Sequence, residues 1–356
     1  MYGEEPLRTV RHTILVCALL AAGMHTASWS RVPQPNRPMG PGQDVDVVRV
    51  DTTLVTLPVR ITDRHRKFVT GLTQEQFHIY EDGVEQEIAY FEPAAETNDA
   101  RPDSSPKPLT LALLLDVSDS TQFKLEQIQR AATAFVDLLR PGDRVMVVAF
   151  DKRVQVLAEA SPDRSILRAA IHRARVGGGT SLYQALASII SGLNRIGGRK
   201  AIVLLTDGVD TSSKGVTSDD TIRAAEAAFV SIYPIQYETY ADFADSPSRE
   251  TYAAGEFGRT AHVTKSGEPV SAAYKRATLY LRLLAEKTSG HFQYADSAKN
   301  LARSFEGIAA QLRQQYTLGY YPKNKTADGA QRLIKVEVGL PKVTVRTRKS
   351  YVYKPH

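Results

Sequence analysis

The sequence predicts an α/β fold: a doubly wound, mostly parallel sheet with helices on both faces, plus a small β-rich module formed by the N-terminal segment and the C-terminal tail. Two apolar runs, 109–115 and 201–205, predict strands buried on both faces, because such strands carry almost no polar residues. Around these runs, apolar residues recur at three- and four-residue steps, which is typical of amphipathic helices. The alternation of the two patterns indicates a sheet covered by helices on each side.

The composition is that of a globular protein. Of 356 residues, 42% are hydrophobic and 24% are charged, so the chain can bury a sizeable core. The formal net charge of +6 at pH 7 is mildly basic. Because this charge is not concentrated in one stretch, we expect no nucleic-acid partner.

Residues 1–28 have the pattern of a secretory signal peptide. Arg8 and Arg11 precede an apolar run at 13–23, and small residues follow it. The run is shorter than the ~20 residues that span a bilayer, so we expect a cleaved peptide and an exported protein, located in the periplasm, in the cell envelope or outside the cell. An uncleaved N-terminal anchor is the alternative, and it would provide the only membrane contact. The single cysteine, Cys17, lies inside the run, so the mature chain would have no disulfide.

The β-rich module is predicted at 45–93, between two linkers. The first linker, 29–44, is rich in Pro and Gly, and the second, 94–107, is poor in apolar residues. The tail, 313–356, returns to a strand pattern. We expect the tail to pack with the N-terminal module, because neither segment alone has enough apolar surface for a stable sheet.

The α/β domain is predicted at 108–312. Its further strands are expected at 145–150, 154–157, 231–237 and 291–294. Its helices are expected at 125–139, 166–174, 182–193, 221–229 and 301–312. A polar segment with Gly and Ser predicts an insertion at 241–275, and the apolar helical pattern resumes at Leu279, Leu283 and Leu284.

Oxygen-bearing side chains follow both buried strands. Asp116, Ser118 and Ser120 come directly after the first strand, and Asp207 follows the second. Thr180 comes after three glycines, just before a predicted helix. Ligands of doubly wound sheets bind outside the carboxyl ends of the strands, so we expect these side chains to form one site. An all-oxygen set with two carboxylates favours a hard cation, and Mg²⁺, which takes few carboxylates, is preferred to Mn²⁺ or Ca²⁺.

These elements resemble the metal-ion-dependent adhesion site (MIDAS) of von Willebrand factor type A (VWA) domains, with its Asp-x-Ser-x-Ser, separate Thr and Thr-Asp-Gly elements. The resemblance covers roughly residues 107–312, except the insertion. It implies that Ser118, Ser120 and Thr180 are direct or switchable ligands. It also implies that Asp116 and Asp207 bind the ion directly or through water. The three glycines before Thr180 further predict a loop that can move toward the ion or away from it.

The flanking segments resemble those of a VWFA-related family common in Acidobacteria. The residues concerned are Leu72-Thr73 through Phe77, Glu81-Asp82-Gly83, Tyr316-Thr317-Leu318-Gly319-Tyr320-Tyr321-Pro322 and Arg348-Lys349-Ser350-Tyr351. With them, the resemblance extends over about residues 45–354. We know of no biochemical role assigned to that family, so this similarity concerns the fold.

The resemblance implies a metal-dependent binding or adhesion module, rather than an enzyme, whose protein partner presents a Glu or Asp carboxylate to the ion. Two alternatives stay open: a periplasmic structural or assembly factor, and a metal-dependent hydrolase. An aspartyl-phosphate enzyme is disfavoured because Ser118 stands where a second Asp is needed, and 177–179 lack the Gly-Lys-Ser/Thr of a phosphate loop. The basic residues Arg346, Arg348 and Lys349 predict a solvated strand face, with an anionic-glycan or membrane patch as the alternative.

Overall fold

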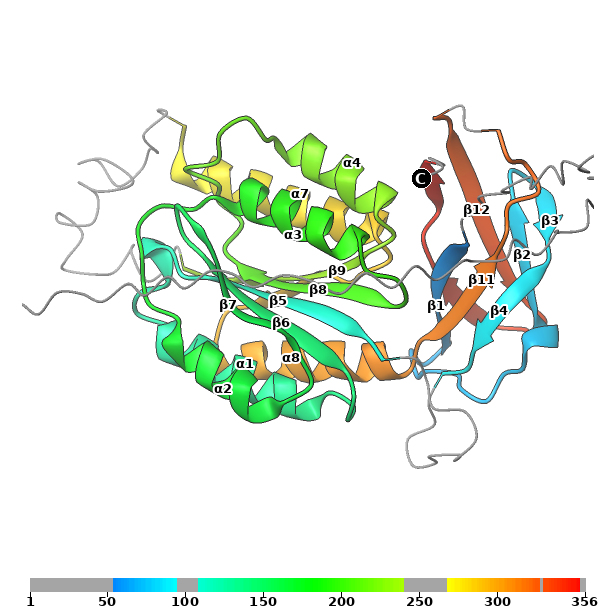
Figure 1. Cartoon of the computed structure of the whole chain (residues 1–356), viewed down its shortest axis with the longest axis horizontal. Helices are drawn as coiled ribbons and strands as arrows, with labels where there is room; N and C mark the ends of the chain where they lie inside the picture. The colour runs from blue at the N-terminus through cyan, green and yellow to red at the C-terminus, as the bar shows by residue number, and fades with distance from the viewer. Residues whose placement is uncertain (1–53, 95–107, 240–267, 327–328, 353–356) are drawn as a thin grey trace, which may run out of the picture. The chain divides into compact units, whose positions relative to one another are not determined.

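The computed structural model describes residues 54–94, 108–239, 268–326 and 329–352 (Figure 1). The predicted signal peptide, the linker at 29–44 and the first residues of the predicted β-rich module lie outside the described residues. Within the described residues, no helix has both the length and the apolar character needed to cross a membrane.

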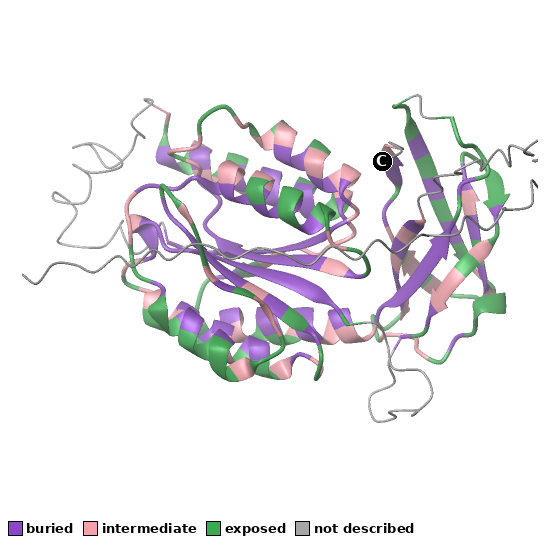
Figure 2. Ribbon diagram, viewed as in Figure 1, coloured by how far each residue is buried: buried purple, intermediate pink, exposed green. Residues whose placement is uncertain are grey.

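A six-stranded sheet forms the centre of the α/β domain, in the order β10-β9-β8-β5-β6-β7. Its strands are β5 (Thr110–Asp116), β6 (Arg144–Phe150), β7 (Val154–Ser161), β8 (Lys200–Thr206), β9 (Ser231–Tyr237) and β10 (Gln293–Ala295). All neighbours are parallel except β6 and β7, which are antiparallel. Every residue of β5 and of β9 is buried (Figure 2), which confirms the mostly parallel sheet with two covered faces.

Among the described residues, three helices pack on each face of this sheet (Figure 1). One face carries α1 (Leu125–Leu138), α2 (Arg164–Arg173) and α8 (Ala298–Arg313), and the other carries α3 (Leu182–Asn194), α4 (Ser218–Ala227) and α7 (Val270–Lys287). Alternate residues of β5 serve the two faces: Leu113 and Leu115 pack with the first group of helices, and Ala112 and Leu114 pack with the second. The apolar run of β5 is thus explained by burial on both sides.

Helix α7 differs from the sequence prediction. It begins at Val270, so the insertion predicted at 241–275 extends too far along the chain. Its buried side includes Ala273 and Ala277, whereas Leu279, which we expected on that side, is 69% exposed. Small residues let the helix approach the sheet closely, but they contribute little to a hydrophobic pattern, and for this reason the start of the helix was missed.

The strands of the N-terminal segment and of the C-terminal tail pair with each other in two four-stranded antiparallel sheets. The N-terminal strands are β1 (Val55–Asp63), β2 (Phe77–Glu81), β3 (Val84–Gln86) and β4 (Ile88–Glu92), with a short 3₁₀ helix at Gln74–Gln76. The C-terminal strands are β11 (Tyr316–Tyr320), β12 (Gln331–Val338), β13 (Val343–Arg346) and β14 (Ser350–Val352). The strand orders are β13-β1-β11-β4 and β14-β12-β2-β3, so β11 lies between β1 and β4. Apolar residues of both sheets share one core, which makes this module a β-sandwich.

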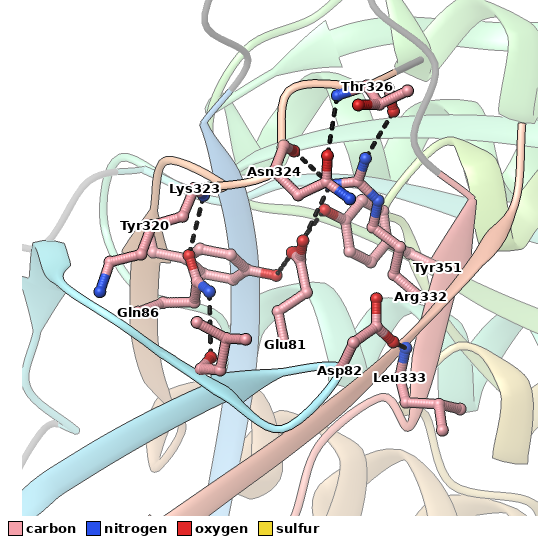
Figure 3. Close-up of polar contacts among 11 residues, drawn as sticks. Glu81, Asp82, Gln86, Tyr320, Lys323, Asn324, Thr326, Arg332, Leu333 and Tyr351 are labelled. Carbon is pink, nitrogen blue, oxygen red and sulfur yellow. Dashed lines mark hydrogen bonds and ion pairs between the residues drawn. The ribbon is translucent and has the colours of Figure 1, made fainter. Parts of the chain in front are cut away.

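The sandwich also encloses a charged cluster around Glu81 (Figure 3). The Glu81 carboxylate accepts a hydrogen bond from Arg332 Nη1 at 2.8 Å and from the hydroxyls of Tyr320 at 2.6 Å and Tyr351 at 2.7 Å. All four side chains are buried. Arg332 also donates to two backbone carbonyls of the 324–326 loop. The buried positive charge of Arg332 is thus balanced by the carboxylate of Glu81, and further donors of its guanidinium are hydrogen-bonded. This cluster joins β2 to β11, β12 and β14.

Candidate functional site

Asp116 is the last residue of β5, and its carboxylate organises the turn that follows. Its Oδ1 accepts hydrogen bonds from the Ser118 amide at 3.0 Å and the Ser118 hydroxyl at 2.6 Å. The Ser118 and Ser120 hydroxyl oxygens lie 3.1 Å apart. The turn continues into a 3₁₀ helix, Asp119–Thr121. Asp116, Ser118 and Ser120 are all buried, so their oxygens are positioned by the turn rather than by solvent.

Asp207 stands at the same edge of the sheet, because it follows β8, the parallel neighbour of β5. Its Oδ1 accepts from the Val209 amide at 3.0 Å, and its Oδ2 accepts from the hydroxyls of Thr239 at 2.9 Å and Tyr274 at 3.3 Å. Ser120 is hydrogen-bonded to the same carboxylate. The carboxylate of Asp207 is therefore held by the segment that follows β9 and by α7, as well as by the turn after β5.

Thr206 links the two strand ends. Its hydroxyl donates to Asp116 Oδ2 at 2.6 Å and accepts the Gly208 amide at 2.9 Å. Asp116 thus receives hydroxyl donors on both carboxylate oxygens, one from its own turn and one from the neighbouring strand.

The buried carboxyl groups of Asp116 and Asp207 lie in surroundings that disfavour ionisation of both. Asp116 is 0% exposed and Asp207 is 2% exposed, and neither makes an ion pair with a basic side chain of the described residues. Burial, together with the charge of Asp207, raises the pKa of Asp116 to about 8, and burial raises the pKa of Asp207. Two carboxylates and several hydroxyls without a basic partner form a donor set that fits a hard cation.

The loop that carries Thr180 is held by its backbone. The Thr180 amide donates to Thr211 Oγ1 at 2.8 Å, and its carbonyl accepts the amides of Thr211 and Ser212, each at 2.9 Å. A Cβ atom on Gly177 would lie 1.8 Å from Asp151 Oδ2, so only glycine fits there. Close packing therefore gives a reason for this glycine other than the mobility that the sequence predicted.

Helix α3 starts directly after the glycine loop and is capped by residues of the loop that follows β8. Asp210 Oδ2 accepts the Tyr183 amide at 3.0 Å, and Ser213 Oγ accepts the Gln184 amide at 3.1 Å. These bonds satisfy two of the amides that a helix leaves unpaired in its first turn. They also connect the start of α3 to the loop after β8.

The structure brings four of the five predicted ligands, Asp116, Ser118, Ser120 and Asp207, into one hydrogen-bonded group. Thr180 is buried in the adjoining loop. Their binding of a metal stays a prediction. In the part of the chain that the structure describes, no group of three or more His, Cys, Asp or Glu is placed to hold a metal ion. The candidate site contains two carboxylates with hydroxyls and does not depend on such a group.

Three residues that hold the carboxylates were not assigned a role from the sequence: Thr206, Thr239 and Tyr274. Thr206 could have been found, because a hydroxyl directly precedes Asp207 at the end of a buried strand. Thr239, just after β9, and Tyr274 of α7 reach Asp207 from distant parts of the chain, and no local pattern marks them. Tyr274 also fell within the segment predicted as an insertion.

Comparison with known proteins identifies the class of domain. Residues 111–209 match the family model of the von Willebrand factor type A domain. Together with the sheet order, this match shows that the chain contains a VWA domain, as the resemblance implied. Among curated proteins, an uncharacterized protein of Synechocystis is 37% identical over 82 residues, which are 22% of this chain and 20% of that protein. The matched part is therefore about a fifth of that relative.

Several solved structures are similar to this chain at low identity. A von Willebrand factor type A protein from Catenulispora acidiphila is 13% identical, with a TM-score of 0.44 over 86% of this chain and 75% of that one. The vWF domain of a type V pili tip protein from Porphyromonas gingivalis is 16% identical, with a TM-score of 0.42 over 59% and 96%. A pilus adhesin from Lactobacillus rhamnosus GG is 11% identical, with a TM-score of 0.45 over 82% and 44%. Likenesses of this size do not bear on function.

Proposed function

We propose that this protein is an exported binding module in which Asp116, Ser118, Ser120, Thr180 and Asp207 hold Mg²⁺, with Mn²⁺ or Ca²⁺ as alternatives. The partner would be a protein that presents a Glu or Asp carboxylate. When bound, the ion would supply the Lewis acidity that attracts this carboxylate. The observation that carries the proposal is a pair of buried carboxylates without a basic partner among the described residues. Asp116 is bonded to the Ser118 hydroxyl and Asp207 to that of Ser120, and the two hydroxyls contact each other.

The chemistry of the donor set favours binding over catalysis. Three of the proposed ligands are neutral: Ser118, Ser120 and Thr180. The site would therefore carry only the two negative charges of its carboxylates, and an incoming anionic group would meet little electrostatic repulsion. The Ser118 hydroxyl donates to Asp116 rather than to a histidine base, whereas a nucleophilic serine needs such a base. Export is proposed from the signal-peptide pattern of the first 28 residues.

The first test is calorimetric titration of Mg²⁺ into the full-length protein and two variants, Asp116→Ala and Asp207→Ala. We expect both variants to lose measurable binding, because each removes one of the two anionic ligands. Asp219→Ala, which removes an exposed carboxylate from the first turn of α4, is the control and should bind like the unaltered protein. Unchanged affinity in Asp116→Ala would refute the site.

The second test concerns the partner. Proteins captured from an extract of the source cells should elute when EDTA is added and should bind again when Mg²⁺ is restored. Asp207→Ala should capture none of them, whereas Asp219→Ala should capture all of them. A partner that stays bound in EDTA, with Mg²⁺ binding intact, would contradict a metal-bridged interaction while leaving the metal site itself in place.

A further inference from the structure

A cavity of about 680 Å³ lies away from the candidate metal site, none of whose residues line it. Its walls come from β1, β12 and β13, from the end of α7 and from the loop between α7 and β10. We call it the basic cavity, because the described residues that line it include six Lys or Arg and, as the one acidic residue among them, Glu286. The six are Arg60, Arg282, Lys335, Arg346, Arg348 and Lys349.

The charge of the basic cavity is only partly neutralised. Lys349 pairs with Glu286 at 2.8 Å, and Lys335 pairs with Glu337 at 2.5 Å. Arg282 lies over the ring of Phe292, 4.4 Å from its centroid. No acidic side chain of the described residues pairs with Arg282, nor with the exposed arginine of β13, Arg346. The cavity therefore keeps an excess of positive charge.

Two arginines are placed against each other. Arg60 of β1 and Arg346 of β13 are directly opposite in the antiparallel register, and like charges in such a pair destabilise a sheet. Arg60 is 8% exposed, and it also contacts Gln311 through its guanidinium. His291 lies near both arginines. Its burial, followed by the positive charges of Arg60 and Arg346, lowers the pKa of its imidazole to about 4. An anion in the cavity would remove this repulsion.

Three buried polar atoms of the same cavity have no hydrogen-bond partner among the described residues: Arg348 Nε and the hydroxyls of Ser289 and Thr347. Buried donors are nearly always paired, so these atoms point to a ligand. Arg348 is 1% exposed, and its Nη1 donates to the backbone carbonyl of Glu226 at 2.9 Å. The sequence predicted Arg348 on a solvated strand face, and its burial in the cavity corrects that prediction.

We infer that the basic cavity is a binding site for a phosphate group. A phosphate group offers three strong acceptor oxygens and close to two negative charges at neutral pH, so it can accept more of these donors than one carboxylate can. Guanidinium groups match its geometry with paired hydrogen bonds. The group would belong to a small phosphorylated molecule or to a lipid headgroup. Residues of the candidate metal site do not line this cavity, so the inference is independent of the proposed function.

The test is calorimetric titration of inorganic phosphate at pH 7 into the full-length protein in EDTA, compared with acetate at equal ionic strength. Phosphate should bind, and acetate should bind much more weakly. Arg346→Gln and Arg282→Gln should each weaken phosphate binding about tenfold or more, the loss expected for one hydrogen bond to a charged group. Arg130→Gln, which removes an exposed arginine of α1, should bind phosphate like the unaltered protein.

Vesicles of phosphatidylcholine with and without phosphatidic acid distinguish the two sources. Binding to phosphatidic-acid vesicles that Arg346→Gln abolishes would assign the phosphate to a lipid headgroup. Binding of soluble phosphate without vesicle binding would assign it to a free small molecule. The inference is overturned if neither probe binds, if acetate binds as tightly as phosphate, or if Arg346→Gln and Arg282→Gln behave like Arg130→Gln.

Discussion

Replacing Thr206 by Val tests the most direct link between the two strands of the candidate metal site. The hydroxyl of Thr206 donates to Asp116 at 2.6 Å, and a methyl group of similar size would remove this bond. Thr206 is 1% exposed, so water cannot replace the hydroxyl. It also accepts the Gly208 amide at 2.9 Å, which would lose its partner. The change therefore alters the hydrogen bonding of Asp116 while leaving all five proposed ligands in place.

The expected loss follows from these contacts. A hydrogen bond to a charged group contributes roughly 1.5–3 kcal/mol, and loss of a partner that orients a metal ligand lowers metal affinity about 10- to 100-fold. We therefore expect Mg²⁺ to bind Thr206→Val with about 10- to 100-fold lower affinity. In EDTA, the free energy of unfolding should fall by roughly 1–3 kcal/mol, because the Gly208 amide is left unpaired in the interior.

The assay is Mg²⁺ calorimetry on the folded variant, combined with urea denaturation in EDTA. Thr133→Val is the matched control, because the Thr133 hydroxyl on α1 is buried and has no hydrogen-bond partner among the described residues. That control should leave the Mg²⁺ affinity unchanged and should not lower the free energy of unfolding, because it removes a buried hydroxyl that has no partner among the described residues. If Thr206→Val binds Mg²⁺ with an affinity within about threefold of that of the unaltered protein, the argument that Thr206 orients Asp116 is refuted.

Three further predictions concern stability. Without metal, the free energy of unfolding should decrease as pH rises from 3.8 to about 8. The raised pKa of Asp116 means that the folded protein holds the proton of this carboxyl group more tightly than the unfolded chain does. Urea titrations across this pH range measure the slope. Gly177→Ala should lower the thermal midpoint, measured by circular dichroism, because its Cβ would collide with Asp151. Glu81→Gln should cost about 3–5 kcal/mol in urea denaturation, because the buried charge of Arg332 loses its partner.

Each of these predictions has its own control. The pH slope should be smaller in Asp116→Asn, and an equal slope there would assign the effect to other groups. Gly197→Ala places a Cβ with nothing within 4 Å, so it should leave the midpoint unchanged, and an equal loss in both glycine variants would remove the packing argument. Glu126→Gln breaks an exposed ion pair on α1 and should have little effect on the denaturation curve.

The central sheet could be predicted from the sequence because a strand that is buried on both faces is apolar along nearly its whole length. β5 and β8 are apolar runs, and a carboxylate follows each of them, so the edge where Asp116 and Asp207 meet was predictable from topology alone. The pairing of the chain ends was also expected, since neither end carries enough apolar surface by itself. Register and strand order within the sandwich depend on contacts between distant residues, which no local pattern encodes.

The parts of the site that were missed are those built from long-range contacts. Tyr274 and Thr239 lie 67 and 32 residues from Asp207 and belong to other elements. The role of Glu81 was equally hidden: the sequence shows only a turn, and its partners come from the other end of the chain. The basic run near the C-terminus was visible, but the burial of Arg348 depends on packing against α4 and was not.

The pairing of β1 with β11 has a consequence for how the chain is made. Tyr316 hydrogen-bonds to the backbone of Val69, 247 residues earlier, and β11 fills the gap between β1 and β4. During synthesis at ordinary rates, the first four strands would wait roughly 10–50 s for the strand that joins them. Through that interval their edges are unpaired and can associate with other chains. The VWA domain, whose contacts are mostly internal, can fold first and bring the two ends together, so that the sandwich closes as the last step of folding.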